Sequence, residues 1–449
     1  MRIAVVGAGI AGLGAAWLLS RHHDVVVFEE QAHLGGHAQT SDVPVAETGG
    51  DCPVDTGFIV YNTASYPNLI ALFDQLDVPW AETSMSFAVS ESNGRYAYSG
   101  SGLGGLFGKP ASVFSPAHWQ MVRDIFRFFE RAKELAATTS DPDGPSLGAW
   151  LEEHNFSRAF IDRHIVPMGA AIWSTPAERM LEFPAAAFAR FFANHGLLQA
   201  RGRPKWRTVV GGSREYVRRL TADTNAVFRP AVRVRQISRD ADGVDITRED
   251  GAQDRFDACV VATHADTALD LLADADATER TTLGAFAYSD NLAVLHRDPT
   301  LMPKQRRLWS SWNYCDGGDG RALSVTYWMN RLQPLQTRED WFVTLNPPVL
   351  PRADLRHGAF AYAHPVFDRA AMRMQPRLWD LQGRQRTWFC GSYFGFGFHE
   401  DGLQSGLAAA EDIGGAARPW VEPGMYDRLT LPAHWTPRAS PVTFDAEPA

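Results

Sequence analysis

The chain has 449 residues, of which 45% are hydrophobic and 21% are charged, as in ordinary globular proteins. This length exceeds one ordinary hydrophobic core, so we expect two closely connected domains. The net charge of −9 argues against nucleic acid as a partner, because nucleic-acid binding requires a basic surface. No stretch approaches about 18 uninterrupted apolar residues, so we expect no membrane-spanning helix and a cytoplasmic protein. The four scattered cysteines lack the spacing of metal ligands, and no metal site is expected.

The first thirty residues carry the most informative pattern. Residues 2–6 form a β-branched run that predicts a strand, and the glycine-rich turn 7–12 follows it directly. Residues 13–19 predict a helix, and the apolar run 25–28 predicts a second strand that ends at Glu29. Strand, glycine turn, helix, strand and acid therefore occur in the order that a dinucleotide-binding unit requires.

Each glycine of this turn has its own physical role. Gly7 makes the tight turn, Gly9 lets the backbone approach a diphosphate, and Gly12 lets the helix pack closely on the strand. The free N–H groups and the positive end of the helix dipole then face the diphosphate. Glu29 stands at the spacing where a carboxylate binds an adenosine ribose hydroxyl, and its charge disfavours an NADP-type ligand. The alternative is a glycine-rich turn in some other α/β unit.

Beyond this unit, the chain changes from α/β character to a helical middle, and later to a strand-rich, aromatic part. Ser115 followed by Pro116 is a helix start signal. The expected elements are a strand at 54–60, a helix at 66–76, a hairpin at 87–98 that turns at 92–94, helices from 116, at 147–153, at 157–165 and at 184–196, a strand at 206–210, a helix at 216–220, strands at 227–234, 243–247, 258–263, 308–314, 323–329, 341–345 and 388–391, a helix at 402–413, and a Pro-rich tail beyond 418 that is extended or mobile.

Several of these motifs together resemble a known family. The glycine turn with Glu29 and Gly35-Gly36 resembles the opening of the flavin-containing amine oxidase superfamily, which includes monoamine oxidases, protoporphyrinogen oxidase and phytoene desaturases. The strand 260–263 and the segment 390–406 also resemble it, so the resemblance spans nearly the whole chain.

A narrower resemblance is to a bacterial group described only as predicted NAD/FAD-binding or FAD-dependent proteins. Genes for cyclopropane or methyl-branched fatty-acid synthesis often neighbour members of that group, and some relatives desaturate or isomerise fatty acyl chains. The segments that carry this resemblance are 54–58, 171–174, 194–198, 311–314 and 397–402.

The resemblance implies an α/β fold, as an α+β two-domain flavoprotein. A Rossmann-like FAD-binding domain would be built from discontinuous segments, beside a substrate domain of mixed sheet and helices. We expect the FAD-binding domain to comprise 1–75, 205–275 and 381–417, the substrate domain 76–204 and 276–380, and an extended tail 418–449.

The C-terminal part favours FAD over NAD as the cofactor. It supplies a second strand, glycine loop and helix, as a long cofactor with two ends requires. A helix N-terminus around residues 401–403 would place N–H groups near the flavin pyrimidine and stabilise negative charge on the reduced ring. The alternative is that this unit is merely the last βα unit of a sheet.

The sequence also departs from the superfamily. His37 stands where an Arg usually follows the glycine pair, and Ser392 stands where an acid usually binds the ribityl chain. No Ser-Gly-Gly-Cys occurs near the C-terminus, so we expect FAD to bind non-covalently. The residues expected to contact FAD are Gly7, Gly9, Ile10, Ala11, Gly12, Glu29, Glu30, Gly35, Gly36, His37, Thr56, Gly57, Phe58, Val232, Ala262, Thr263, Gly391, Ser392, His399, Asp401, Gly402 and Leu403.

Candidate catalytic residues are fewer, because hydride transfer to flavin N5 needs positioning and an apolar pocket more than an acid or base. His399 and Glu400 lie in the loop expected nearest the flavin ring, so either could shuttle a proton, although Glu400 could equally cap the following helix. Tyr327 and His195 are further candidates, with a packing role as the alternative for both. Asn313 has the same two interpretations.

The expected function is that of an FAD-dependent oxidoreductase. The resemblance implies that it dehydrogenates or isomerises a hydrophobic substrate, a fatty acyl or phospholipid acyl chain. The 14 Trp and 26 Phe suit a large apolar cavity, although they equally suit a well-filled core. One alternative is an amine oxidase acting on a small amine or polyamine. Another is a non-catalytic flavoprotein partner of a lipid methyltransferase. A lipid substrate also makes peripheral membrane contact possible.

Overall fold

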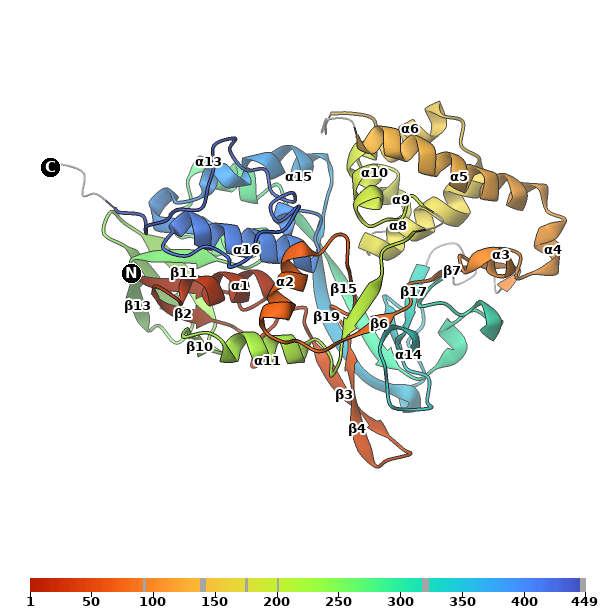
Figure 1. Ribbon diagram of the computed structural model, residues 1–449, viewed down its shortest axis with the longest axis horizontal. Coiled ribbons are helices and arrows are strands. Elements are labelled where there is room, and N and C mark those ends of the chain that lie inside the picture. Colours follow the sequence, from red (N-terminus) through yellow and green to blue (C-terminus); the bar gives the residue numbers. More distant parts are fainter. Residues whose placement is uncertain (92–93, 138–142, 174–176, 200–201, 317–322, 445–449) are drawn as a thin grey trace.

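The structure is a computed structural model that describes residues 1–91, 94–137, 143–173, 177–199, 202–316 and 323–444. Two parts lie side by side along its longest axis (Figure 1). One contains the N-terminus and a parallel sheet, and the other contains a mixed sheet beneath a layer of helices.

The dinucleotide unit lies in a five-stranded parallel sheet whose strand order is β10-β2-β1-β14-β20. The central strand β1 (Arg2–Val6) pairs with β2 (Asp24–Phe28) on one side and with β14 (Ala258–Val261) on the other. β10 (Val227–Arg229) and β20 (Thr387–Phe389) form the two edges. Three distant parts of the chain therefore contribute strands to one sheet.

Two helices from opposite ends of the chain pack together on this sheet. α1 (Ile10–Leu19) lies against α16 (His399–Ile413), and both are almost entirely buried. A Cβ atom built on Gly406 of α16 would lie 2.1 Å from the carbonyl oxygen of Ala11 in α1, so only glycine permits this approach. Among the described residues, no helix combines the length and hydrophobicity needed to cross a membrane.

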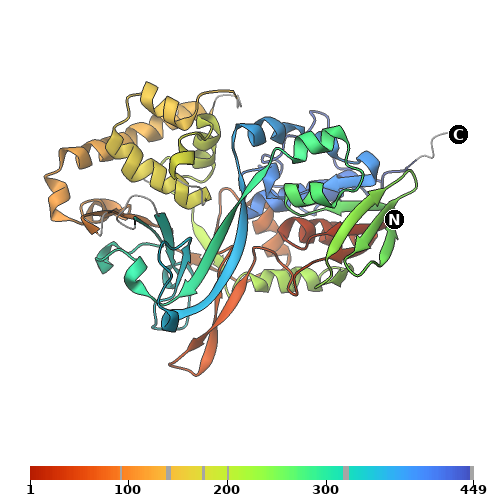
Figure 2. The ribbon, with the colours of Figure 1, turned by 180° about the vertical axis from the view of Figure 1, so that it is seen from behind.

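The second part is built on a seven-stranded mixed sheet. Its two longest strands pair antiparallel along their whole length and run between the two parts of the molecule (Figure 2). In spatial order the strands are β19 (Arg356–Val366), β15 (Ala287–His296), β18 (Phe342–Leu345), β17 (Leu323–Trp328), β16 (Trp312–Asp316), β7 (Phe87–Glu91) and β8 (Tyr96–Ser99).

Helices with an aromatic core form the outer layer of this part. Ser115 caps α5 (Pro116–Ala136), as its sequence predicts, because its side chain accepts a hydrogen bond from the backbone N–H of His118. Phe128 of α5 lies in the centre, with its ring centroid 5.5–6.3 Å from those of five other aromatic residues. The other main helices of the layer are α6 (Leu147–Glu153), α8 (Val166–Trp173) and α10 (Ala185–Asn194).

The remaining elements are smaller. The helices are α2 (Pro67–Gln75), α3 (Gly102–Leu106), α4 (Pro110–Val113), α7 (Arg158–Phe160), which continues as a π-helical turn Ile161–Ile165, α9 (Ala177–Met180), α11 (Arg214–Ala222), α12 (Ala265–Leu271), α13 (Ala277–Leu283), α14 (Met329–Leu332) and α15 (Arg369–Met374), with 3₁₀ turns at Pro299–Leu301, Arg306–Leu308, Ala353–Leu355, Gln375–Leu381, Arg384–Arg386 and Ser392–Phe394. The strands are β3 (Thr40–Val45), β4 (Gly50–Asp55), β5 (Tyr61–Asn62), β6 (Trp80–Thr83), β9 (Trp206–Val209), β11 (Val234–Arg239), β12 (Val244–Arg248) and β13 (Gln253–Phe256).

Most predicted elements are present within a few residues of their expected positions, and two of the expected strands are wrong. The strand expected at 54–60 ends at Asp55, because the buried Asp55 carboxylate accepts hydrogen bonds from the backbone and hydroxyl of Ser213 and the chain turns there. The strand expected at 227–234 is two strands, separated at Ala231, whose φ is +55°. β19 was not predicted. The turn residues 92–93 of the predicted hairpin lie outside the described residues.

The C-terminal tail was predicted to be extended or mobile, and its described residues lie against the rest of the protein. Residues 418–444 contain no helix or strand, yet they pack against the parallel-sheet part. Arg418 is buried and forms a two-fold hydrogen-bonded ion pair with Glu411 of α16, at 2.7 and 2.8 Å. Trp420 stacks on Trp17 of α1 with 5.8 Å between ring centroids. The tail therefore holds α1 and α16 from outside.

The buried ion pair predicts how strongly the tail contributes to stability. Arg418→Met leaves the Glu411 carboxylate buried without its cation, which should destabilise the fold by about 3–5 kcal/mol. Thermal unfolding followed by circular dichroism measures the change. Arg438→Met is the matched control, because Arg438 is half exposed and its nitrogen lies 3.7 Å from Asp412. Equal effects of the two substitutions would show that the tail does not pack in solution.

Candidate functional site

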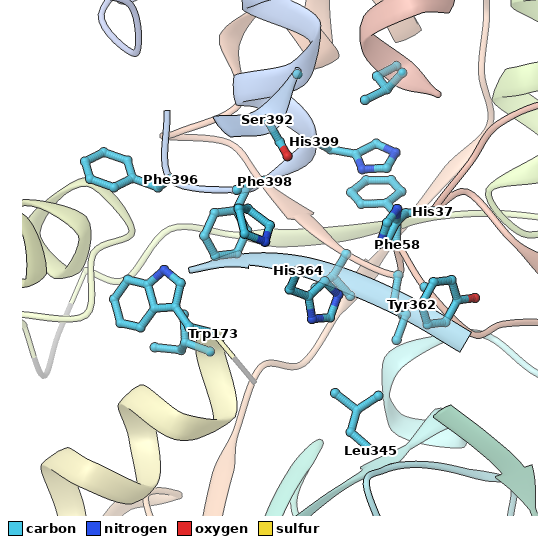
Figure 3. Close-up of a pocket in the computed structure, with 18 of the residues that line it drawn as sticks. His37, Phe58, Trp173, Leu345, Tyr362, His364, Ser392, Phe396, Phe398 and His399 are labelled. Atoms are coloured by element: carbon cyan, nitrogen blue, oxygen red, sulfur yellow. The ribbon is translucent and has the colours of Figure 1, made fainter. Parts of the chain in front are cut away.

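A cavity of about 2270 Å³ lies between the parallel sheet, the seven-stranded sheet and the helical layer. A typical small-molecule site occupies roughly 300–1,000 Å³, so this cavity can hold an extended cofactor together with a second molecule. Its lining comes from all parts of the chain, from Val6 to Gly402. Figure 3 shows aromatic and histidine side chains projecting into it from several elements.

The glycine turn forms one end of the cavity and has the predicted geometry. Gly7 has φ +100°, and a Cβ there would lie 2.8 Å from the carbonyl oxygen of Ala262. A Cβ on Gly12 would lie 2.0 Å from the carbonyl oxygen of Gly7, so Gly12 lets α1 begin directly on the strand. A Cβ on Gly9 would meet nothing within 4 Å, which leaves the backbone open to a ligand. Glu29 accepts a hydrogen bond from the N–H of Ala8 at 2.8 Å and lines the cavity.

A second glycine turn lies against the first. Gly35 forms an isolated bridge with Gly9, and its N–H donates to the carbonyl of Ala8 at 2.8 Å. A Cβ on Gly36 would lie 3.1 Å from the Cα of Gly9. This close contact brings His37 to the cavity wall.

The C-terminal unit closes the other side. α16 begins at His399, three residues before the predicted helix, because Asp401 accepts hydrogen bonds from the N–H groups of Phe396 and Phe398 and fixes the loop. Ser392 points into the cavity (Figure 3), and Gly402 is also part of the lining. The N-terminus of α16 is thus directed at the cavity.

The structure brings most of the predicted cofactor residues to this one cavity. Gly12, Gly35, Asp401 and Leu403 are not among the lining residues, since they shape the turns and the packing of α16 behind them. The predicted residues that line it are Gly7, Gly9, Ile10, Ala11, Glu29, Glu30, Gly36, His37, Thr56, Gly57, Phe58, Val232, Ala262, Thr263, Gly391, Ser392, His399 and Gly402.

Three histidines from different segments surround one region of the wall. The ring of His37 lies 6.2 Å from that of His264 and 5.5 Å from that of His364, measured between centroids. The Nε2 atom of His37 is shielded from solvent and has no hydrogen-bond partner among the described residues. Burial, and then the nearby histidines, hold the pKa of His37 well below its usual value, so its ring is neutral at pH 7.

His399 lies close to His37 and is held there by two aromatic residues (Figure 3). Its ring is stacked on Phe58, with 3.8 Å between centroids and 9° between planes (Figure 3). Its Nε2 atom lies 2.9 Å from the hydroxyl of Tyr216. Burial lowers the pKa of His399 to about 3, so the ring is neutral and fixed. A neutral, stacked ring can form a flat part of the cavity wall, but it is poorly suited to carry a proton.

The remaining catalytic candidates are in different surroundings. Glu400 lies outside the cavity lining. Its buried carboxylate accepts hydrogen bonds from the N–H groups of Asn68 and Leu69 at the start of α2, so it caps that helix instead of the helix that follows it, and this placement argues against a catalytic role. Tyr327 and His195 both line the cavity. Burial lowers the pKa of His195 to about 3, and its ring stacks on Phe191 at 3.9 Å. Asn313 bonds to backbone groups and has a packing role.

From the aromatic side of the cavity an apolar arm extends into the helical layer. Trp173, Phe191 and Phe398 mark its inner end, where Phe191 stacks on Phe398 with 4.9 Å between centroids. No acidic residue occurs in the described lining of this arm. It is formed by Leu106, Val122, Ile125, Phe126, Phe128, Phe129, Met168, Ile172, Trp173, Phe191, Phe192, Leu197 and Phe398.

Sequence reasoning missed several residues of this site. Tyr362 and His364 come from β19, which was not predicted, and the alternation of alanine with larger residues at 359–364 was the available signal. His264 directly follows the buried strand β14, so its position after a strand of the parallel sheet was a second signal. The partners of Phe396 and Phe398 come from α10, far away in the sequence.

The role of Glu400 leads to a prediction about stability. Glu400→Gln puts an N–H donor where two backbone N–H groups and two side-chain amides now donate, and should destabilise the fold by about 1–3 kcal/mol. Thermal unfolding should show this loss, while turnover per folded molecule stays unchanged. The exposed Glu422→Gln is the matched control. Loss of turnover without loss of stability would restore a catalytic role.

The lowered pKa of a buried histidine also predicts that mild acid destabilises the fold. Burial lowers the pKa of His364 from 6.5 to about 4, so the unfolded chain binds more protons than the folded one between those values. Stability should therefore fall as the pH decreases through this window, by on the order of 1–3 kcal/mol for His364. His364→Gln should reduce the decrease in unfolding temperature between about pH 6.5 and about pH 4.5. His22→Gln changes an exposed histidine and should leave this decrease as it is in the wild type. An equal decrease in unfolding temperature in the two variants would contradict the assignment of the effect to His364.

Among curated proteins, two relatives share parts of the chain. A 15-cis-phytoene desaturase of Synechococcus elongatus is 33% identical over 102 residues, which are 22% of this chain and 20% of the desaturase. The AofH protein of Mycobacterium tuberculosis, named as a flavin-containing monoamine oxidase, is 26% identical over 258 residues, which are 56% of this chain and 54% of that protein. The chain therefore spans about a fifth and about half of these two relatives.

Solved structures with the same fold match almost the whole chain. A CLA-producing fatty acid isomerase from P. acnes has a TM-score of 0.65 at 16% identity, covering 92% of this chain and 97% of the isomerase. Cyclohexylamine oxidase from Brevibacterium oxydans has a TM-score of 0.65 at 15% identity, covering 92% and 99%. At this identity the likeness shows the fold, and the predicted fold class is confirmed.

The family described as flavin containing amine oxidoreductase matches residues 10–289, which are more than half of the chain. The match includes α1, β14 and the helical layer, and the solved structures extend the likeness to the C-terminal unit. The chain therefore belongs to the family of flavin-containing amine oxidoreductases, with FAD as its cofactor.

Proposed function

We propose that this FAD-dependent oxidoreductase dehydrogenates or isomerises a long apolar chain, a fatty acyl or phospholipid acyl group. The single observation that carries the proposal is the apolar arm, whose described lining residues include no carboxylate. Burial of an acyl chain in such an arm contributes roughly 0.8 kcal/mol per CH₂ group, so the free energy of binding becomes more favourable as the chain lengthens. The fold likeness to a fatty acid isomerase is consistent with this substrate class.

The residues present fit FAD. The open backbone at Gly9 and the carboxylate of Glu29 suit a diphosphate and an adenosine ribose, as in other dinucleotide sites. The unpaired Nε2 of His37 offers a hydrogen-bonding group to the cofactor. The N-terminus of α16 supplies a positive dipole for the flavin end.

When bound, FAD supplies a hydride acceptor and donor at its flavin ring. The protein's own residues then provide position and exclude water. Phe58 and His399 form a flat wall, Phe398 and Phe191 form the inner end of the arm, and none of these rings carries charge at pH 7. Such surroundings favour the positioning of an apolar carbon chain over the binding of a protonated amine.

An amine substrate would need different neighbours. A cation buried in an apolar site is normally paired with a carboxylate. The acidic residues of the described cavity lining are Glu29, Glu30, Glu249, Asp270 and Asp290, and all lie on elements other than the helices of the arm. The arm therefore favours an uncharged chain.

The test compares the products that the FAD-loaded wild type and a variant form from different substrates. Fatty acids and phospholipids with one double bond, and a panel of amines, would be incubated with each protein, and products analysed by mass spectrometry for changed double bonds. Met168→Trp should narrow the arm and reject the longest acyl chains while shorter ones still react, because Met168 lines the arm. Met168→Leu is the conservative control. Peroxide release with amines and unchanged lipids would overturn the proposal.

A further inference from the structure

An unusual group of exposed aromatic residues lies at one end of the helical layer. Phe114 is 85% exposed, Phe126 53%, Trp119 51% and Val113 44%, all within fourteen residues of sequence. They belong to α4, to the residue after it, and to the first turns of α5. This end of the molecule lies far from the N-terminal sheet in both views (Figures 1 and 2). We name these four residues the apolar tip.

The apolar tip is built as a firm surface. Trp119 donates a hydrogen bond from its indole nitrogen to the carbonyl of Val113 at 2.8 Å, and its ring lies 4.6 Å from that of Phe107. Trp119 and Phe126 are seven residues apart on α5, so they lie on the same face of the helix. Large exposed apolar groups of this kind mark interaction sites on soluble proteins.

The charge around the tip is opposite to that of the whole protein. Between residues 95 and 134 the chain has six basic and three acidic side chains. The acidic ones, Asp124, Glu130 and Glu134, form ion pairs with Arg127, Lys133 and Arg131, so Arg95, Lys109 and Arg123 are the excess cations. The exposed Arg307 donates to the carbonyl of Gly108, and with Arg95, Lys109 and Arg123 it forms a basic rim. The chain as a whole carries −9. A local basic rim on an acidic protein favours an anionic surface as the partner.

The tip is continuous with the apolar arm. Phe126 is more than half exposed and also lines the cavity, and its neighbours Val122 and Phe129 line the cavity as well. Gly102 and Leu106 of α3 line it from the other side. The cavity therefore reaches the surface between α3 and α5, beside the tip.

We propose that the apolar tip docks into an anionic lipid surface and that acyl chains enter the arm from that surface. Aromatic residues with a basic rim are the combination by which surface-bound proteins insert into the headgroup region. The entry of a lipid chain rests on the proposed function, whereas docking does not. A second copy of this chain is a less suitable occupant, because two tips with the same basic rim would repel each other.

The test is flotation of the full FAD-loaded chain with vesicles of phosphatidylglycerol and phosphatidylcholine. Wild-type protein should float with these vesicles, less so with phosphatidylcholine alone or at high salt, because charge attraction is then absent or screened. Phe114→Ser, and Phe114→Ser with Trp119→Ser, should weaken binding, the pair by about tenfold or more. Phe114 alone is the safer change, since its side chain is 85% exposed. The matched control is Val421→Ser, because Val421 is 89% exposed and lies outside the tip.

The outcomes separate docking from function. Variant and wild type should react equally with a soluble short acyl substrate, while the variant should react more slowly with lipid in vesicles. Vesicle binding by wild type without any acyl turnover would leave docking supported and the proposed function wrong. Acyl turnover by a wild type that does not float, or dimers in vesicle-free solution that the double variant abolishes, would overturn docking.

Discussion

Close backbone contact among three segments, made possible by glycines, brings the two ends of the chain to one cavity. Gly12 lets α1 begin against Gly7, and Gly406 lets α16 approach the carbonyl of Ala11 to within van der Waals distance. A side chain at either position would separate α1 from α16 or from its strand, and the cavity would lose one of its walls. The buried pair of Arg418 and Glu411 then holds the same helices from outside.

The cavity also depends on the long antiparallel pair of β15 and β19. These strands run from the parallel-sheet part to the mixed sheet, and they carry Tyr362 and His364 to the wall that the glycine turns approach. The cofactor end and the apolar arm are therefore parts of one continuous cavity. A chain held in the arm can therefore reach the cofactor end without leaving the cavity.

The side chains expected to position the substrate near the flavin are uncharged. Burial holds His399 and His195 in the neutral state, and the only acidic candidate, Glu400, is used to cap α2. The protein thus provides shape, aromatic walls and exclusion of water, and the redox chemistry is that of FAD. An apolar opening beside exposed aromatic residues and a basic rim is consistent with a substrate that arrives from a lipid surface.

The local parts of the fold could be predicted from the sequence, because their signals are local. The glycine turn, the strands around it and the cap at Ser115 depend on residues a few positions apart. The strand at 54–60 and the single strand at 227–234 were wrong because Asp55 and Ala231 respond to partners far away in the sequence, Ser213 and Gln31.

Local motifs were enough to predict the cofactor class and most of the residues that line its end of the cavity, because a diphosphate site is formed by residues close together in the chain. The packing of distant segments was needed to show that Glu400 faces α2, that the tail packs on α16, and that three histidines from separate segments meet. It alone showed that the aromatic helices leave an open arm and an exposed tip, because which face of a helix is buried depends on what packs against it.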